Sequence, residues 1–214
     1  MLRLADHLYG TVVGETPILF DVAKGRYLLL RGPAAENFRT LWDNESTSGG
    51  VAPLIEAGLV HDASTVKFEP GPQSAEVSYE DGSQPLPSRR LTIGAIHAQI
   101  VVRRALRRQK LPGVLKTLRA RSGAPSRVIR SATHVTEADV SSAFVRSRLL
   151  LPSLDQCVAR SIAIVSILGR YGHDATLIVG VRLPFAAHCW VQCENRVVSD
   201  PLDRARAFQP IFAL

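Results

Sequence analysis

The sequence is poor in cysteine, with three in 214 residues. So few cysteines cannot form the disulfide framework of a small secreted domain, and the odd number leaves at least one thiol unpaired. We therefore expect a cytoplasmic chain. No run of about 18 uncharged apolar residues is present, so no membrane span is expected. Asp6 and His7 stand where a signal peptide needs an apolar run, which argues against export.

Acidic residues are missing from a long central stretch, with none between Asp81 and Glu137. Residues 1–85 hold 12 Asp/Glu and 6 Lys/Arg, whereas residues 86–214 hold 7 and 20. This asymmetry predicts two units with different partners. It also argues against an N-terminal reader of nucleic acid, because phosphate binding needs a basic face. We predict two domains, over 1–82 and 83–214, joined by a Pro/Gly-rich linker at 70–88.

What is present is an ordinary globular composition, 46% apolar and 21% charged. The chain length suits one or two domains. The N-terminal part alternates between short apolar runs and turns. Its pattern predicts strands over 9–13, 16–22 and 26–30, followed by helices over 33–42 and 51–57. This order favours a small winged-helix-like domain.

The remainder of the chain changes to helical spacing. We predict helices over 91–106, 111–121 and 137–150, the last capped by Thr136. A further helix is expected over 154–171, with Ser153 as its N-cap and Asp155 in its first turn. Strands over 175–181, 188–193 and 197–200 follow it. Both parts together predict the α+β class.

Three side chains in the last third of the chain could carry chemistry. Cys157 falls in the first turn of a predicted helix, where unpaired N–H groups favour a thiolate. His188 opens one predicted strand, and Asp200 ends the neighbouring one. A thiolate can attack a carbonyl carbon, an imidazolium can protonate the leaving amine, and a carboxylate can orient the imidazole. Each residue alone also has a structural interpretation: a buried thiol, a core histidine and a turn-forming aspartate.

These residues lie in motifs that resemble a known family. The resemblance is to the transglutaminase-like leader peptidases of lasso-peptide biosynthesis, in the fused form with a precursor-recognition domain before the protease. The N-terminal match is similar to the small peptide chaperone of quinone-cofactor synthesis. The matching segments are Asp155-Gln-Cys-Val-Ala-Arg-Ser161, Thr176-Leu-Ile-Val-Gly-Val-Arg182, Phe185-Ala-Ala-His-Cys-Trp-Val191, Val198-Ser-Asp200 and Leu19-Phe-Asp-Val-Ala-Lys-Gly-Arg-Tyr-Leu-Leu-Leu30.

The resemblance implies a cytoplasmic cysteine protease with a transglutaminase/papain-like fold. It would bind and remove the leader of a ribosomally made precursor, so that an asparagine-synthetase-like cyclase can close the freed N-terminus. Cys157 would be the nucleophile, His188 the base and Asp200 the orienting group. The sequence departs from the family at Cys189, where alanine is usual, and at Gln192, where an acidic residue is common. The backbone N–H of Cys157 is the candidate oxyanion donor.

The N-terminal unit would bind the leader as an added strand, because an exposed edge offers unpaired backbone groups. The expected edge is 26–31, and the helix over 51–57 would form the other wall. The candidate peptide-binding residues are Arg26, Tyr27, Leu28, Leu29, Leu30, Val51, Leu54 and Ile55.

No cofactor and no metal are expected. Cys189 and Cys193 lie four residues apart on one predicted strand, about 13 Å from each other, and His188 points to the opposite face. Other functions remain open from the residues: an adaptor with a decayed protease fold, an acyl-transferring transglutaminase, or a winged-helix nucleic-acid binder. The basic stretch could be a solvated face, a site for an acidic partner, or a surface for nucleic acid or anionic membrane. It comprises Arg89, Arg90, Arg103, Arg104, Arg107, Arg108, Lys110, Lys116, Arg119, Arg121, Arg127 and Arg130.

Overall fold

The computed structural model of the chain describes residues 2–4, 7–44, 54, 56, 58–62, 74–83, 85–122, 135–151 and 156–214. The candidates Val51 and Ile55, the predicted cap Ser153 and the first-turn Asp155 lie outside these residues. In the part that is described, no helix is both long and apolar enough to cross a bilayer.

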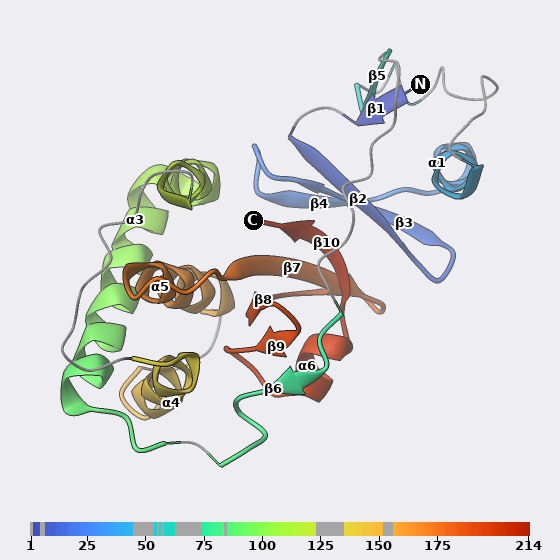
Figure 1. The fold of residues 1–214 in the computed structure, drawn as a ribbon. Coiled ribbons are helices and arrows are strands. Elements are labelled where there is room, and N and C mark those ends of the chain that lie inside the picture. Colours follow the sequence, from blue (N-terminus) through green and yellow to red (C-terminus); the bar gives the residue numbers. More distant parts are fainter. Residues whose placement is uncertain are drawn as a thin grey trace.

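The N-terminal part is a three-stranded antiparallel sheet with one helix beside it (Figure 1). The strands β2 (Leu8–Val13), β3 (Thr16–Asp21) and β4 (Arg26–Leu29) lie in that order, and α1 (Pro33–Asn44) follows. Gly25 turns the chain between β3 and β4 with a φ of 63°. Glycine adopts this backbone conformation without strain. The three strands and the helix predicted here are confirmed. A short pair, β1 (Leu2–Leu4) with β5 (Val60–Asp62), lies beside them.

A five-stranded sheet forms the centre of the C-terminal part, in the order β10-β7-β8-β9-β6. Its long strands are β7 (Thr176–Arg182) and β8 (Ala186–Cys193), with β9 (Arg196–Val197) and β10 (Gln209–Ala213) beside them. The last strand, β6 (Val77–Ser78), pairs parallel with β9, while the other pairs are antiparallel. The linker predicted over 70–88 is therefore wrong at β6, whose two residues were too short a run to stand out in a Pro/Gly-rich context.

Helices α3 (Arg89–Ser122), α4 (Glu137–Ser147) and α5 (Cys157–Arg170) gather on one side of this sheet (Figure 1). The short helix α6 (Leu202–Arg206) lies toward the other side. α3 is interrupted at Lys110, where φ is 56° and ψ is 178°, so it is two helices in succession as predicted. Thr136 caps α4 through a reciprocal capping box with Asp139, also as predicted.

The alternation of side chains along β7 and β8 divides the core into two layers. One face of the sheet packs against α3, α4 and α5, and its buried strand residues are Leu177, Val179, Val181, Cys189, Val191 and Cys193. The other face packs against α6 through Ile178, Trp190, Val197 and Ala205. Cys189 and Cys193 both face the helices and remain free thiols, which fits their expected packing role.

The N-terminal sheet shares its core with the C-terminal part. Phe212 of β10 contacts Tyr9 edge-on, with ring centroids 4.7 Å apart, and Phe20 at 6.0 Å. The other face of β3 is turned toward α1, where Leu19, Phe38, Leu41 and Leu54 form a separate cluster. The N-terminal sheet is therefore packed between α1 and the C-terminal part. The domain boundary at 82/83 stays a prediction.

Candidate active site

Cys157 is the first residue of α5. The helix was expected from residue 154, but Gln156 stands outside it as the N-cap, with no side-chain capping bond. The helix therefore begins at the cysteine itself, whose side chain is half-buried. A buried apolar face holds α5 on the sheet, and its residues include Ile162, Ala163, Ile164 and Leu168. The start of the helix presents N–H groups without an intrahelical partner to this side chain.

His188 and Asp200 lie next to each other at the site. His188 comes from β8, and Asp200 from the segment that follows β9. Nε2 of His188, on β8, lies 3.1 Å from Oδ1 of Asp200, and both side chains are 6% exposed. The ring N–H does not point along this line, so the contact is one of charge and lacks a straight hydrogen bond. Asp200 was expected to end a strand, but β9 stops at Val197 and Asp200 follows three residues later.

The three side chains act on one another's protonation. Cys157 and His188 line the same cavity, and each shifts the pKa of the other. Because Nε2 faces the carboxylate, Nδ1 is the nitrogen left for the thiol. Burial acts to raise the pKa of Cys157, but His188 and the backbone N–H groups of Cys189 and Val158 outweigh it, so this pKa falls below its ordinary value.

The pKa values of His188 and Asp200 shift in the directions that favour their charged forms. Burial lowers the pKa of His188, but Asp200 and Cys157 outweigh burial and raise this pKa to about 9. Burial raises the pKa of Asp200, and the contact with His188 more than offsets it, so this pKa is lowered. The favoured state is a thiolate beside an imidazolium and a carboxylate. Burial instead raises the pKa of Cys189 and of Cys193, which keeps both as neutral thiols.

Hydrogen bonds fix the Asp200 carboxylate and its backbone. Ser199 donates its hydroxyl to Oδ2 of Asp200 at 2.7 Å and accepts the N–H of Val191 at 3.0 Å. Ser78 of β6 donates its hydroxyl to the Asp200 carbonyl at 2.6 Å. The parallel pairing of β6 with β9 thus holds Asp200 from a residue that lies 122 positions upstream.

An aromatic wall packs against the His188 ring on the same face of the sheet. Trp190 is stacked near it, with centroids 6.2 Å apart and the planes inclined by 17°, and Phe208 lies 5.3 Å away. Gly180 of β7, the cross-strand partner of His188, makes room for this arrangement. A Cβ at Gly180 would lie 2.6 Å from the Trp190 ring and 2.9 Å from Cβ of Phe208.

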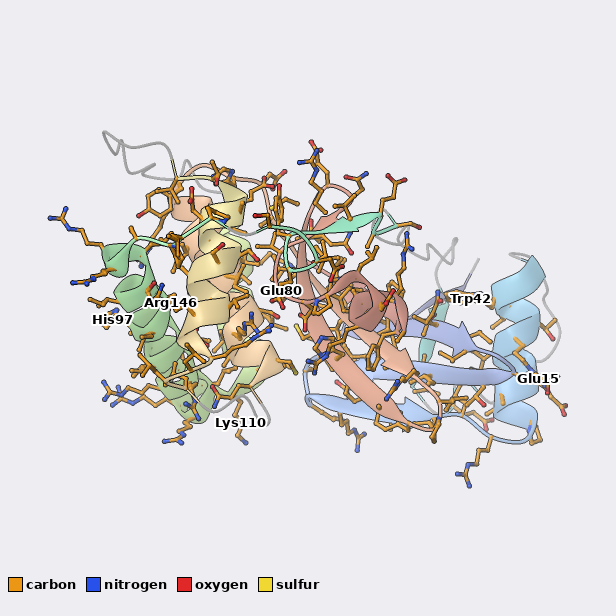
Figure 2. All side chains as sticks on the ribbon, turned by 90° about the horizontal axis from the view of Figure 1, so that it is seen from below. Glu15, Trp42, Glu80, His97, Lys110 and Arg146 are labelled. Carbon is orange, nitrogen blue, oxygen red and sulfur yellow. The ribbon has the colours of Figure 1, made fainter. Side chains whose placement is uncertain are left out.

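A cavity of about 140 Å³ opens over the thiol. Its lining includes Gln156, Cys157, His188 and Asp200, together with three arginines, Arg148, Arg160 and Arg204. Behind it, the buried carboxylate of Glu80 binds Arg148 through two bonds of 2.6 and 2.9 Å and Arg160 through one of 3.0 Å. Glu80 lies in the middle of the molecule, far from Glu15 and Trp42 at its N-terminal end (Figure 2).

The predicted peptide-binding residues occupy the edge of the N-terminal sheet. β4 is an outer strand, and no other strand of the described residues pairs with its free side. Tyr27 stacks on Phe20 at 4.7 Å and contacts Phe185, three residues before His188, at 5.3 Å. Burial raises the pKa of Tyr27, and the charges of Cys189 and Cys157 add to this rise. Through Phe185, the edge is thus in contact with the segment that leads into β8 and His188.

The side chains of this edge alternate between two environments. Tyr27 and Leu29 pack toward the core that contains Cys157, whereas Leu28 and Leu30 pack toward α1. Arg26 is exposed and lies 3.7 Å from the buried Asp21 carboxylate. Leu54 is fully buried against α1, so it supports this wall from within the core.

Several residues of the site were not singled out from the sequence. Arg160 and Ser199 lie inside the motifs quoted above, so their proximity to Cys157 and Asp200 in the chain was an available signal. Arg204 follows Asp200 by one helical turn. Glu80 and Ser78 carried no such signal, because their role depends on a two-residue parallel strand.

The comparison with known families agrees with this geometry. The family described as the transglutaminase-like superfamily matches residues 98–213, more than half of the chain. The chain belongs to the transglutaminase-like superfamily. No curated protein and no solved structure matches it.

Proposed function

We propose that this protein is a cysteine peptidase that removes the leader from a lasso-peptide precursor. The observation that carries the proposal is the thiol at the start of α5, which shares a cavity with His188 and the buried Asp200. The superfamily supports a cysteine hydrolase or transferase. The resemblance of the N-terminal motif, and the unpaired outer side of β4 in the described sheet, support a peptide as substrate.

In the proposed reaction, the Cys157 thiolate attacks the carbonyl carbon of the scissile bond. The N-terminus of α5, including the N–H of Cys157, stabilises the oxyanion that forms. The His188 imidazolium gives its proton to the leaving amine, and Asp200 keeps the ring oriented. A water molecule, deprotonated by His188, then releases the leader as a carboxylic acid and restores the thiol.

The leader would add to the outer edge of β4. In an antiparallel ladder, alternate residues turn both backbone groups to the partner strand. Leu30 donates its N–H to Pro17 at 3.0 Å, so Leu28 and Arg26 face β3, whereas Tyr27 and Leu29 face outward. These two residues supply the backbone groups for an added strand, which would continue toward Cys157 past Tyr27. A cyclase partner would use the released N-terminus.

The test is to incubate the purified protein with a precursor peptide encoded by a neighbouring reading frame and to weigh the products. We expect two fragments whose masses add up to the precursor plus one water. Cys157→Ala should abolish cleavage while binding is retained, and Cys189→Ala and Cys193→Ala should cleave normally. Cleavage by a folded Cys157→Ala variant would contradict the proposal.

An amine in the same assay separates hydrolysis from acyl transfer, since both reactions pass through the same acyl-enzyme. With glycine ethyl ester present, a peptidase gives mostly the acid. If the amide of the added amine dominates, the protein is a transferase. If the precursor is bound but never acylates Cys157, the protein is an adaptor.

A further inference from the structure

Three guanidinium groups surround the cavity that contains the thiol. Arg148 comes from the end of α4, Arg160 from the second turn of α5, and Arg204 from α6. Among the described residues that line this cavity, Asp200 is the one with an acidic side chain. Elements far apart in the sequence thus direct positive charge to one place, within reach of Cys157.

The fixed negative charges do not cancel this positive charge. Glu80 lies between Arg148 and Arg160 and neutralises one of the two. Asp200 faces His188 at 3.1 Å and Arg204 at 3.7 Å. Among the described residues, three guanidiniums and an imidazolium thus face two carboxylates and a thiolate, which leaves one positive charge in excess. Acylation of Cys157 removes the thiolate charge together with the imidazolium proton, which passes to the leaving amine, so one positive charge remains in excess.

The arginines also keep hydrogen-bond donors that the protein does not use. A guanidinium has five N–H groups. Nε of Arg160 is buried and has no hydrogen-bond partner among the described residues. The side chain of Arg204 is 60% exposed. Its contact with Asp200 is too long for a hydrogen bond. The planar fork of a guanidinium fits a carboxylate through two parallel bonds.

We propose that this cavity is a subsite for a carboxylate group that the substrate carries next to the scissile bond, with Arg204 as the direct contact and Arg148 and Arg160 behind it. The inference rests on the proposed function, because it places the carboxylate beside the nucleophile Cys157. The cavity has a volume of about 140 Å³. A space of this size suits a group as large as an aspartate or glutamate side chain. The α-carboxylate of a peptide C-terminus has the same chemistry.

The direct test compares two alkylating reagents that differ only in charge. Iodoacetate and iodoacetamide each form an S–CH₂ bond with the thiolate and release iodide. We expect Cys157 to react with iodoacetate faster than with iodoacetamide by roughly tenfold, relative to the ratio for 2-mercaptoethanol at the same pH and low salt. Mass spectrometry of the Cys157 peptide gives both rates, and high salt should reduce the preference.

Matched variants assign the preference to the cavity. Arg204→Gln should bring the ratio close to that of 2-mercaptoethanol, and Arg204→Lys should retain part of it. Arg104→Gln removes the same charge from the exposed side of α3 and should leave the ratio unchanged. An equal loss in Arg104→Gln would show that net charge alone attracts iodoacetate, and this outcome would overturn the subsite.

Two isomers then distinguish the sources of the carboxylate. N-acetylglutamate α-amide carries only a side-chain carboxylate, whereas N-acetylglutamine carries only a C-terminal one. Protection of Cys157 against iodoacetamide by the first compound assigns the subsite to an acidic side chain, and protection by the second assigns it to a peptide C-terminus. The absence of any preference for iodoacetate, at a Cys157 that reacts well with iodoacetamide, would overturn the inference and leave the proposed function intact. A Cys157 that reacts with neither reagent would contradict the proposed function itself.

Discussion

The protonation of His188 sets the pH range of the proposed reaction. Activity needs a thiolate at Cys157 and an imidazolium at His188 together. Burial lowers the pKa of His188, but its carboxylate partner and Cys157 raise it to about 9, so the rate should fall as the pH passes about 9 and the ring loses its proton. On the acid side, the rate should fall as the thiolate is protonated, below the ordinary pKa of a thiol.

Asp200→Asn tests this assignment. The carboxylate favours the imidazolium, so removal of its charge should lower the pKa of His188. The alkaline limb of the pH–rate profile should then move down by about one pH unit. Turnover should also fall by about tenfold or more, with peptide binding nearly unchanged. Asp203→Asn, at an exposed position of α6, is the matched control and should leave the alkaline limb of the pH–rate profile in place. A shifted limb in the Asp203 variant alone would assign the orienting role to Asp203.

At the scale of single elements, the outer edge of β4 gives a test of strand addition. Leu29→Pro removes an outward N–H, whereas Leu29→Ala keeps it and loses a similar part of the side chain. We expect the leader to bind the proline variant about two- to tenfold more weakly than the alanine variant, which corresponds to one hydrogen bond. Titration of each variant with leader peptide measures this difference.

The same edge contains its own internal control. Leu28→Pro removes an N–H that bonds to β3, so it should lower the melting temperature far more than Leu29→Pro does. Equal leader binding by the Leu29 proline and alanine variants, with both folded, would rule out backbone pairing along this edge.

The close approach of β7 to the aromatic wall gives a second test at this scale. Gly180→Ala would bring a methyl group within 2.6 Å of the Trp190 ring. Overpacking of this kind costs about 1–3 kcal/mol. We expect a matching loss in the free energy of unfolding and a lower turnover, because the displaced ring packs near His188. Gly169→Ala in α5 has no heavy atom near its Cβ and should be neutral or slightly stabilising. Urea unfolding followed by circular dichroism measures both.

The regular elements could be predicted from the sequence because each has a local cause. An apolar run specifies β7, alternation specifies β8, helical spacing specifies α1 and α4, and Thr136 as N-cap specifies where α4 begins. The motif around Cys157, His188 and Asp200 predicted that these residues come together, and the structure places them so. Glu80 and β6 were missed because two residues carry no period, and a parallel pair depends on a strand about 120 positions away.

At the scale of the whole molecule, the two parts share one core, and the two tryptophans can report on it. Trp42 lies in α1 and Trp190 in β8, one in each part. Because Ile18 and Phe20 belong to the same cluster as α5, we expect both parts to unfold together. Trp42→Phe and Trp190→Phe leave one reporter each, and the two fluorescence transitions in urea should have the same midpoint. Two separate midpoints would show that the parts fold independently.

The segment that carries Ser78 and Glu80 determines where this chain could be divided into two genes. A cut at 82/83 would leave these residues on the N-terminal product and deprive the buried guanidinium of Arg160 of its carboxylate. Loss of one partner from a buried ion pair costs about 3–5 kcal/mol. A cut before Ser74 keeps both residues with the sheet to which they belong. Two chains expressed as 1–73 and 74–214 should therefore show normal alkylation of Cys157, while the pair 1–82 and 83–214 should not. The segment from Ser74 onward, which resembles a linker in the sequence, would therefore have to be encoded together with the C-terminal part.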